Sequence, residues 1–409
     1  MLDDVIYVFS RALSVVVRPL LLYWIVYTGL EDQSIQLALL YTITTSVTYL
    51  LAVEVHKEYY RLIFANEGIK FNSIHKVKVF SKYFTDILRM GVLGSLVGFT
   101  VWYALSGDLI TSLMVLLVIA LDYFVVEYMR YLIFAKRFRA WSLVQTSRYT
   151  VPAIFGFLVV PFITNEAIFV YLISYVVCLS MAILILIKDA RLVRIKKTKY
   201  LQLKRISIKT ITGLFKDRFF YVAAAFSNRH TILIDRYIIY FIDTTFFTFY
   251  TLISLFLNVI PMFVDMFFIA RNRARFVKRN IPLLEIFRDK YFIVINIGGI
   301  LVASASIAFV IITNYTLSSL LVIQSAILLS SFSIFSVSTP IYELIFWHKT
   351  MMERLLIEVC YCISLSFIGS VIYFLELPTT WFLIFMMTLH ILRFLFLCFT
   401  LRFSSNLKS

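Results

Sequence analysis

The sequence predicts an all-α polytopic membrane protein. Of its 409 residues, 61% are apolar and only 15% are charged, and the mean hydropathy is +0.90. A soluble domain carries about 25% charged residues, and its interior has no room for this much apolar surface. In lipid, by contrast, a helix of roughly 20 apolar residues crosses the hydrocarbon core and satisfies its own backbone hydrogen bonds.

The basic residues predict how many helices cross the membrane. Most of the 39 Lys and Arg lie in blocks such as 130–148 and 188–218, and the long stretches between the blocks hold few or none. Each stretch is long enough for two spans and a short turn. Because basic loops stay in the cytoplasm, we expect twelve helices, short outer turns and cytoplasmic N- and C-termini. The expected spans are 6–30, 35–55, 84–106, 109–133, 148–164, 167–187, 219–242, 246–270, 291–313, 316–339, 355–375 and 380–401.

A weak internal repeat divides the chain into halves. We expect an N-terminal six-helix lobe at 1–188, a cytoplasmic linker at 189–218 and a C-terminal six-helix lobe at 219–409. In both halves a Phe-Ser pair is followed closely by one arginine, and by a second arginine seven residues later. These positions are Phe9-Ser10-Arg11 with Arg18, and Phe226-Ser227-Asn228-Arg229 with Arg236. Parallel repeats surround the substrate path in transporters, so the lobes are expected to be pseudo-symmetric around a central cavity.

Four arginines within the spans are the candidate binding residues. Arg11 and Arg18, like Arg229 and Arg236, are separated by two helical turns and therefore lie on one helix face. A charge within the bilayer normally faces a partner or a wet cavity, and guanidinium groups bind phosphate bidentately. The four arginines thus predict an anion-binding cavity. Alternatively, they pair with internal acids such as Asp235 or extend to the membrane surface.

Three carboxylates within or near the spans are candidates for ion or proton coupling: Glu54, Asp122 and Asp265. For Asp122, a structural salt bridge to an arginine is an equal alternative. Glu343 and Glu358 flank an expected cytoplasmic loop, where solvent can reach them.

The motifs argue against an enzyme. The chain has no H-E-x-x-H, P-loop or G-x-G-x-x-G pattern, and Cys360 and Cys362 lack the second ligand pair of a zinc site. We therefore expect no catalytic residue, metal or cofactor. The basic residues occur in blocks that fit membrane topology and contact with lipid head groups, so no nucleic-acid partner is expected.

Two regions resemble a known family. The segments FSRALSVVVRPLLLYWIVYTGL and VEVHKEYYRLIF, and residues 226–276 with their Asp235-Arg236 pair, Tyr250 and Pro261, resemble polysaccharide flippases of the O-antigen type. These flippases belong to the multidrug/oligosaccharidyl-lipid/polysaccharide exporter superfamily. The resemblance implies transport of an undecaprenyl-pyrophosphate-linked oligosaccharide from the cytoplasmic to the periplasmic leaflet of the bacterial inner membrane, for lipopolysaccharide O-antigen or capsule biosynthesis.

The resemblance also implies roles and partners. Arg11, Arg18, Arg229 and Arg236 would attract the pyrophosphate, while Glu54, Asp122 and Asp265 would serve coupling during alternating access. Membrane lipids, a polysaccharide polymerase and a chain-length regulator are the expected partners. Two alternatives remain open. One is a drug or metabolite exporter of the same superfamily, and the other is a non-catalytic membrane subunit of a glycan assembly complex.

Overall fold

A computed structural model of the chain describes residues 2–51, 91–92, 94–134, 138–159, 167–192, 233–269, 272, 275–276, 283–314, 318–348 and 351–406. These residues form helices and short turns, and none of them forms a β-strand. The chain divides into two compact units, Met1–Ala225 and Phe226–Ser409.

Seven helices of the described part are long and apolar enough to cross a membrane, as expected for a multi-pass membrane protein. The apolar spans are Leu109–Met129, Ile168–Ile185, Thr244–Ile269, Lys290–Thr313, Ser319–Tyr342, Leu355–Phe374 and Thr379–Thr400. The expected total of twelve, and its arrangement as two lobes, stay predictions.

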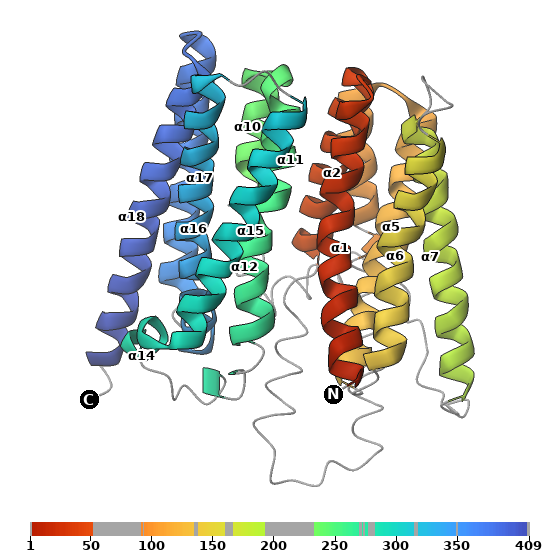
Figure 1. The fold of residues 1–409 in the computed structure, drawn as a ribbon, viewed down its shortest axis with the longest axis horizontal. Coiled ribbons are helices and arrows are strands. Elements are labelled where there is room, and N and C mark those ends of the chain that lie inside the picture. Colours follow the sequence, from red (N-terminus) through yellow and green to blue (C-terminus); the bar gives the residue numbers. More distant parts are fainter. Residues whose placement is uncertain are drawn as a thin grey trace, which may run out of the picture. The chain divides into compact units, whose positions relative to one another are not determined.

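Unit 1 is a helical bundle in which α6 has a central place. Its elements are α1 (Leu2–Tyr27), α2 (Glu31–Leu51), a helical stretch within 91–106, α5 (Leu109–Phe134), α6 (Phe138–Val159) and α7 (Ala167–Leu192). Helix α6 packs against both α1 and α7, and α5 packs against α7 (Figure 1). Because α6 begins at Phe138, the expected start at residue 148 was wrong. Arg148 therefore lies within a helix and not at the edge of a basic loop.

Unit 2 contains the remaining described helices. Its elements are α10 (Ile234–Ile242), α11 (Thr244–Leu257), α12 (Val259–Phe263), η2 (Val264–Ile269), α14 (Leu283–Arg288), α15 (Lys290–Asn314), α16 (Ser319–His348), α17 (Met351–Phe374) and α18 (Thr379–Asn406). Helix α18 packs against α16 and α17, while α10 packs against α11 and α17 (Figure 1). A hydrophobic cluster around Phe268, Phe292 and Leu397 joins η2 to α15 and α18.

The expected span 246–270 is a broken helix. Helix α11 ends at Leu257, the short α12 follows a turn at Asn258, and η2 continues as a π-helix. Pro261 has no N–H, so the Leu257 carbonyl lacks its usual donor one turn later. Close to the break, the side-chain amide of Asn258 donates from Nδ2 to the Ser254 carbonyl at 2.8 Å. Kinks of this kind are expected at proline and at π-helical turns.

The outer surface of the described helices differs from that of a soluble protein, although the interior also holds many apolar side chains. Large apolar side chains face outward on several helices, with Leu184 66%, Ile312 75% and Phe374 79% exposed. Charged side chains such as Arg148 and Glu358 are buried. In water an outward apolar surface of this extent drives association, whereas in lipid it is the ordinary state of a spanning helix.

Candidate functional site

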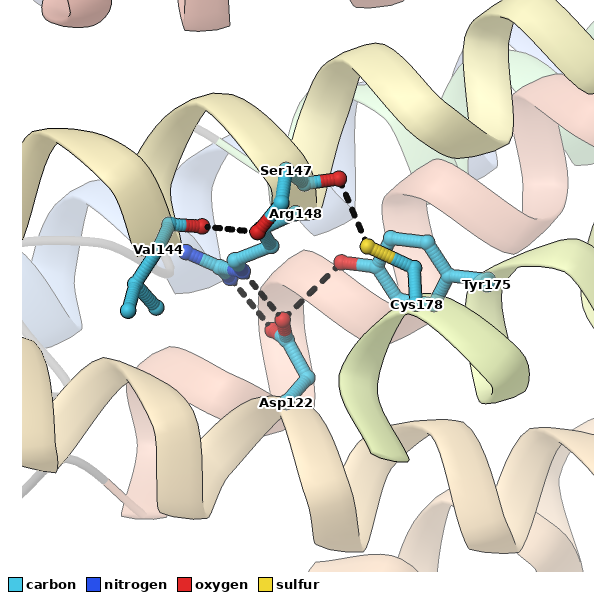
Figure 2. A network of polar contacts seen from close by, with 6 residues as sticks. All are labelled: Asp122, Val144, Ser147, Arg148, Tyr175 and Cys178. Carbon is cyan, nitrogen blue, oxygen red and sulfur yellow. Dashed lines mark hydrogen bonds and ion pairs between the residues drawn. The ribbon is translucent and has the colours of Figure 1, made fainter. Parts of the chain in front are cut away.

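The interior of unit 1 holds an ion pair between α5 and α6. Arg148 donates from Nε to Oδ1 of Asp122 at 2.5 Å and from Nη2 to Oδ2 at 2.6 Å. The hydroxyl of Tyr175, on α7, donates to the same Oδ1 at 2.9 Å (Figure 2). Asp122 and Arg148 are 4% and 5% exposed. A carboxylate this far from water is stable because its partner is bidentate and a third donor completes its hydrogen bonding.

Arg18, on α1, lies next to this ion pair but is held differently. Its guanidinium carbon is 5.4 Å from the ring centroid of Tyr41 and 4.9 Å from that of Tyr149. Its Nε is buried and makes no hydrogen bond, and within the described residues no carboxylate forms an ion pair with it. Cation–π contacts thus replace the usual carboxylate partner.

The two arginines meet at one aromatic ring. The guanidinium carbon of Arg148 lies 4.7 Å from the centroid of Tyr149, the ring that Arg18 also contacts. The Tyr41, Tyr171 and Tyr175 rings continue this cluster through contacts of 6.1 and 5.9 Å between centroids. Two positive groups therefore share one tyrosine, and within the described ranges only Arg148 has a carboxylate bonded to it.

In unit 2, Arg236 lies at the start of α10 and is 2% exposed. Its backbone N–H donates to Oδ1 of the neighbouring Asp235 at 2.8 Å, and the hydroxyl of Tyr250 donates to Oδ2 of that carboxylate. Tyr250 also approaches the sulfur of Met386 on α18, at 3.6 Å. Asp235 is therefore satisfied by a tyrosine and a backbone amide beside the predicted binding residue.

Unit 2 holds a buried ion pair of its own, which was not expected from the sequence. Arg393, on α18, donates to Oε1 of Glu358, on α17, from Nε at 3.0 Å and from Nη2 at 2.8 Å. The expectation that solvent reaches Glu358 was wrong, because this residue is 0% exposed. The rings of Phe335, Tyr342 and Tyr361 lie 5.0 to 5.4 Å from the guanidinium carbon of Arg393. Tyr361 also contacts His390 through its hydroxyl, at 3.2 Å.

The other predicted site residues are only partly described. Arg229 and Glu54 lie outside the described residues, as does the side chain of Arg11 on α1. Asp265 lies in the first turn of η2, next to the break in the helix. Of the seven predicted residues, the structure brings Arg18 and Asp122 into one cluster, with Arg148 and Tyr149 between them.

Sequence reasoning missed Arg148 and Tyr149 as site residues. Arg148 was assigned to the basic block 130–148, and Tyr149 is one of 25 tyrosines with no distinguishing pattern. One signal in the sequence could have revealed them. The segment from residue 138 onward is long enough for α6 to begin before residue 148, which places Arg148 inside the helical bundle.

Within the described ranges, no cluster of three or more His, Cys, Asp and Glu side chains is placed to hold a metal ion. A cavity of about 250 Å³ lies between α15 and α16, and its lining, which includes Ile307, Ala308 and Leu329, carries no charge.

The arrangement in unit 1 is suited to binding an anion. It supplies a guanidinium with no carboxylate partner in the part of the chain that the structure describes, a second guanidinium in contact with the same ring, and a frame of tyrosines. No protein-family model, curated protein or solved structure matches the chain. The described helices are those of a multi-pass membrane protein, and the flippase resemblance stays a prediction.

Proposed function

We propose that the protein is a membrane transporter that flips an undecaprenyl-pyrophosphate-linked oligosaccharide from the cytoplasmic to the periplasmic leaflet. The lipid carrier already resides in the bilayer, so the task of the protein is to shelter the charged and polar head group during the crossing. The apolar helices and the guanidinium cluster of unit 1 both support this proposal.

One observation carries it: Arg18 has no carboxylate partner among the described residues, whereas Arg148 and Arg393 each have one. A charge placed within the membrane costs about 2.5–3.5 kcal/mol on insertion scales. A purely structural arginine in this position would be expected to have an acidic partner, as the other two have. A cation without one is the arrangement that a site for an anionic ligand requires, because the ligand supplies the missing charge.

The alternatives fit this cluster less well. An exporter of cationic drugs needs a negative cavity, but the carboxylate of Asp122 is already neutralised by Arg148. A non-transporting subunit of a glycan assembly complex gives no reason for Arg18 to have no carboxylate partner among the residues that the structure describes. Within the proposal, a polysaccharide polymerase and a chain-length regulator act downstream of the exported intermediate.

The test is genetic. Deletion of the gene should reduce surface polysaccharide and accumulate the lipid-linked intermediate on the inner leaflet, and Arg18→Ala and Arg236→Ala should reproduce this phenotype. Arg275→Ala is the matched control, because Arg275 is exposed and pairs with exposed Glu285. Normal export by Arg18→Ala and Arg236→Ala, at normal protein abundance, would overturn the assignment of these arginines to the binding site. Normal polysaccharide in the deletion strain, with raised drug sensitivity, would favour the drug exporter.

A further inference from the structure

The ion pair of Asp122 and Arg148 has the geometry with which arginine binds phosphate. Two guanidinium nitrogens of Arg148 each donate to one oxygen of Asp122, at 2.5 and 2.6 Å. A phosphate group presents two oxygens to arginine in the same bidentate manner. Asp122 thus occupies the positions on Arg148 that an anionic ligand would otherwise take.

The second guanidinium of the cluster contacts the same aromatic ring as the first. Arg18 and Arg148 contact the ring of Tyr149 at 4.9 and 4.7 Å from its centroid. Two cations in a medium of low dielectric repel each other strongly unless an anion lies near both. Of the two guanidinium groups, the described contacts bond Asp122 only to that of Arg148. These two cations and one carboxylate together carry one positive charge in excess.

Asp122 also has a second hydrogen-bond donor besides Arg148. The hydroxyl of Tyr175 donates to Oδ1 at 2.9 Å, from a helix different from the one that carries Arg148 (Figure 2). If Arg148 turns away, Asp122 keeps this hydrogen bond and is not left fully unsatisfied in the interior. The tyrosine therefore lowers the cost of breaking the ion pair.

We propose that Asp122 is an internal stand-in for the phosphate of the substrate, and that Arg148 exchanges this carboxylate for the arriving head group. Arg18 and Arg148 then bind the diphosphate together, beside the ring of Tyr149 that both contact, while the hydroxyl of Tyr175 stays bonded to Asp122. On release, the carboxylate returns to Arg148 and displaces the ligand. A carrier needs such a competitor, because a head group bound too tightly is never delivered. This inference rests on the proposed function, since it takes Arg18 to be an anion-binding residue.

Direct binding to the purified full-length protein in detergent tests the exchange. The probe is farnesyl diphosphate, and inorganic pyrophosphate in a parallel titration shows whether the lipid chain contributes. Asp122→Asn keeps the shape of the side chain but removes its charge, so it should bind the probe about tenfold more tightly than the wild type. Arg148→Gln should bind the probe more weakly than the wild type. In the double variant Asp122→Asn with Arg148→Gln, the tighter binding caused by Asp122→Asn should be lost. Arg18→Gln should bind neither probe.

Tyr175→Phe is the second variant, because it leaves the ion pair and its net charge in place. It should weaken binding, since Asp122 then has no partner once Arg148 turns to the ligand. Cys178→Ala is its control: Cys178 lies one turn further along α7 and donates only to the Ser147 carbonyl, at 2.6 Å (Figure 2). The Cys178→Ala variant should bind the diphosphate probes with the affinity of the wild type.

The outcomes separate the two proposals. If Arg18→Gln loses binding but Asp122→Asn and Tyr175→Phe bind as the wild type does, the exchange is wrong and the anion site stands. If Arg18→Gln binds both probes normally, the proposed function loses its site as well. A purely structural ion pair predicts lower melting temperatures for these variants with unchanged affinity.

Discussion

Glu358 and Arg393 link α17 to α18 through an ion pair that water does not reach. Their side chains are 0% and 3% exposed, and Nη2 of Arg393 lies 2.8 Å from Oε1 of Glu358. A single carboxylate oxygen accepts both guanidinium bonds, while Oε2 of Glu358 is buried without a hydrogen bond. Three aromatic rings surround the guanidinium, so its charge is stabilised from several sides.

Removing one partner of this pair should be more harmful than removing both. Glu358→Leu leaves the charge of Arg393 buried without its carboxylate, and we expect a loss of roughly 3–5 kcal/mol in the free energy of unfolding. Glu358→Leu with Arg393→Met replaces the pair by apolar groups and should recover most of that loss. Thermal unfolding of the three proteins in the same detergent measures the difference. A double variant no more stable than the single one would contradict the prediction, because Arg393 would then carry no penalty as an unpaired buried charge.

Arg18 and Arg148 should respond in opposite ways to the same substitution. Arg148→Met leaves Asp122 buried without its bidentate partner, so it should cost roughly 3–5 kcal/mol of stability. Arg18→Met removes a cation that has no carboxylate partner in the described structure, so stability should stay within about 1 kcal/mol of the wild type or rise. Melting temperatures and transport should be measured together. Arg18→Met is expected to keep its stability and lose export, whereas a large loss of stability would assign Arg18 a structural role.

The sequence was informative about helices and less so about their partners. Apolar length and the scarcity of Lys and Arg predicted spans that contain helix wherever the structure describes them. The start of α6 was placed ten residues late because the positive-inside rule counts charges without knowing their partners. Arg148 is buried beside Asp122, and hydropathy alone does not distinguish it from a loop arginine.

The site was predicted in part for a related reason. Arg18 and Asp122 were selected because each interrupts an apolar run, and both belong to the cluster in unit 1. Their connection through Arg148 and Tyr149 depends on how three helices are rotated about their axes, which one sequence does not specify. Glu358 was misplaced by the same limit, since its distance from a loop does not reveal that it faces Arg393.

Two adjacent glycines of α15 offer a matched test of packing at the broken helix. A Cβ on Gly299 would lie 3.2 Å from Cα of Ile260 in α12, whereas a Cβ on Gly298 would have no neighbour within 4 Å. Alanine within a helix gains about 0.5–1 kcal/mol over glycine, but overpacking against backbone costs about 1–3 kcal/mol. Gly298→Ala should therefore raise the melting temperature, and Gly299→Ala should lower it. Equal effects of the two substitutions would contradict the close approach of α15 to α12.

Asp108 caps α5 at a turn outside the membrane-spanning segment. Its carboxylate accepts from the N–H of Ile110 at 2.9 Å and of Thr111 at 3.4 Å, while the preceding Gly107 has a φ of +67°. Hydrogen bonding by the Thr111 side chain, and then by the Ile110 N–H, holds the pKa of Asp108 below its ordinary value of 3.8. Asp108→Ala should therefore cost about 1 kcal/mol at neutral pH, as loss of a helix cap does.

The same cap gives a dependence on pH with a defined sign. Because the folded pKa is lowered, the carboxylate stabilises the folded state fully above the unfolded pKa, and this contribution is lost as the pH falls below about 4. Asp108→Asn is the matched control, since asparagine caps helices as well as aspartate but does not titrate in this range. The melting temperature of the wild type should equal or exceed that of Asp108→Asn at pH 7 and fall relative to it at pH 3. A constant difference between the two proteins across this range would mean that the carboxylate does not cap α5.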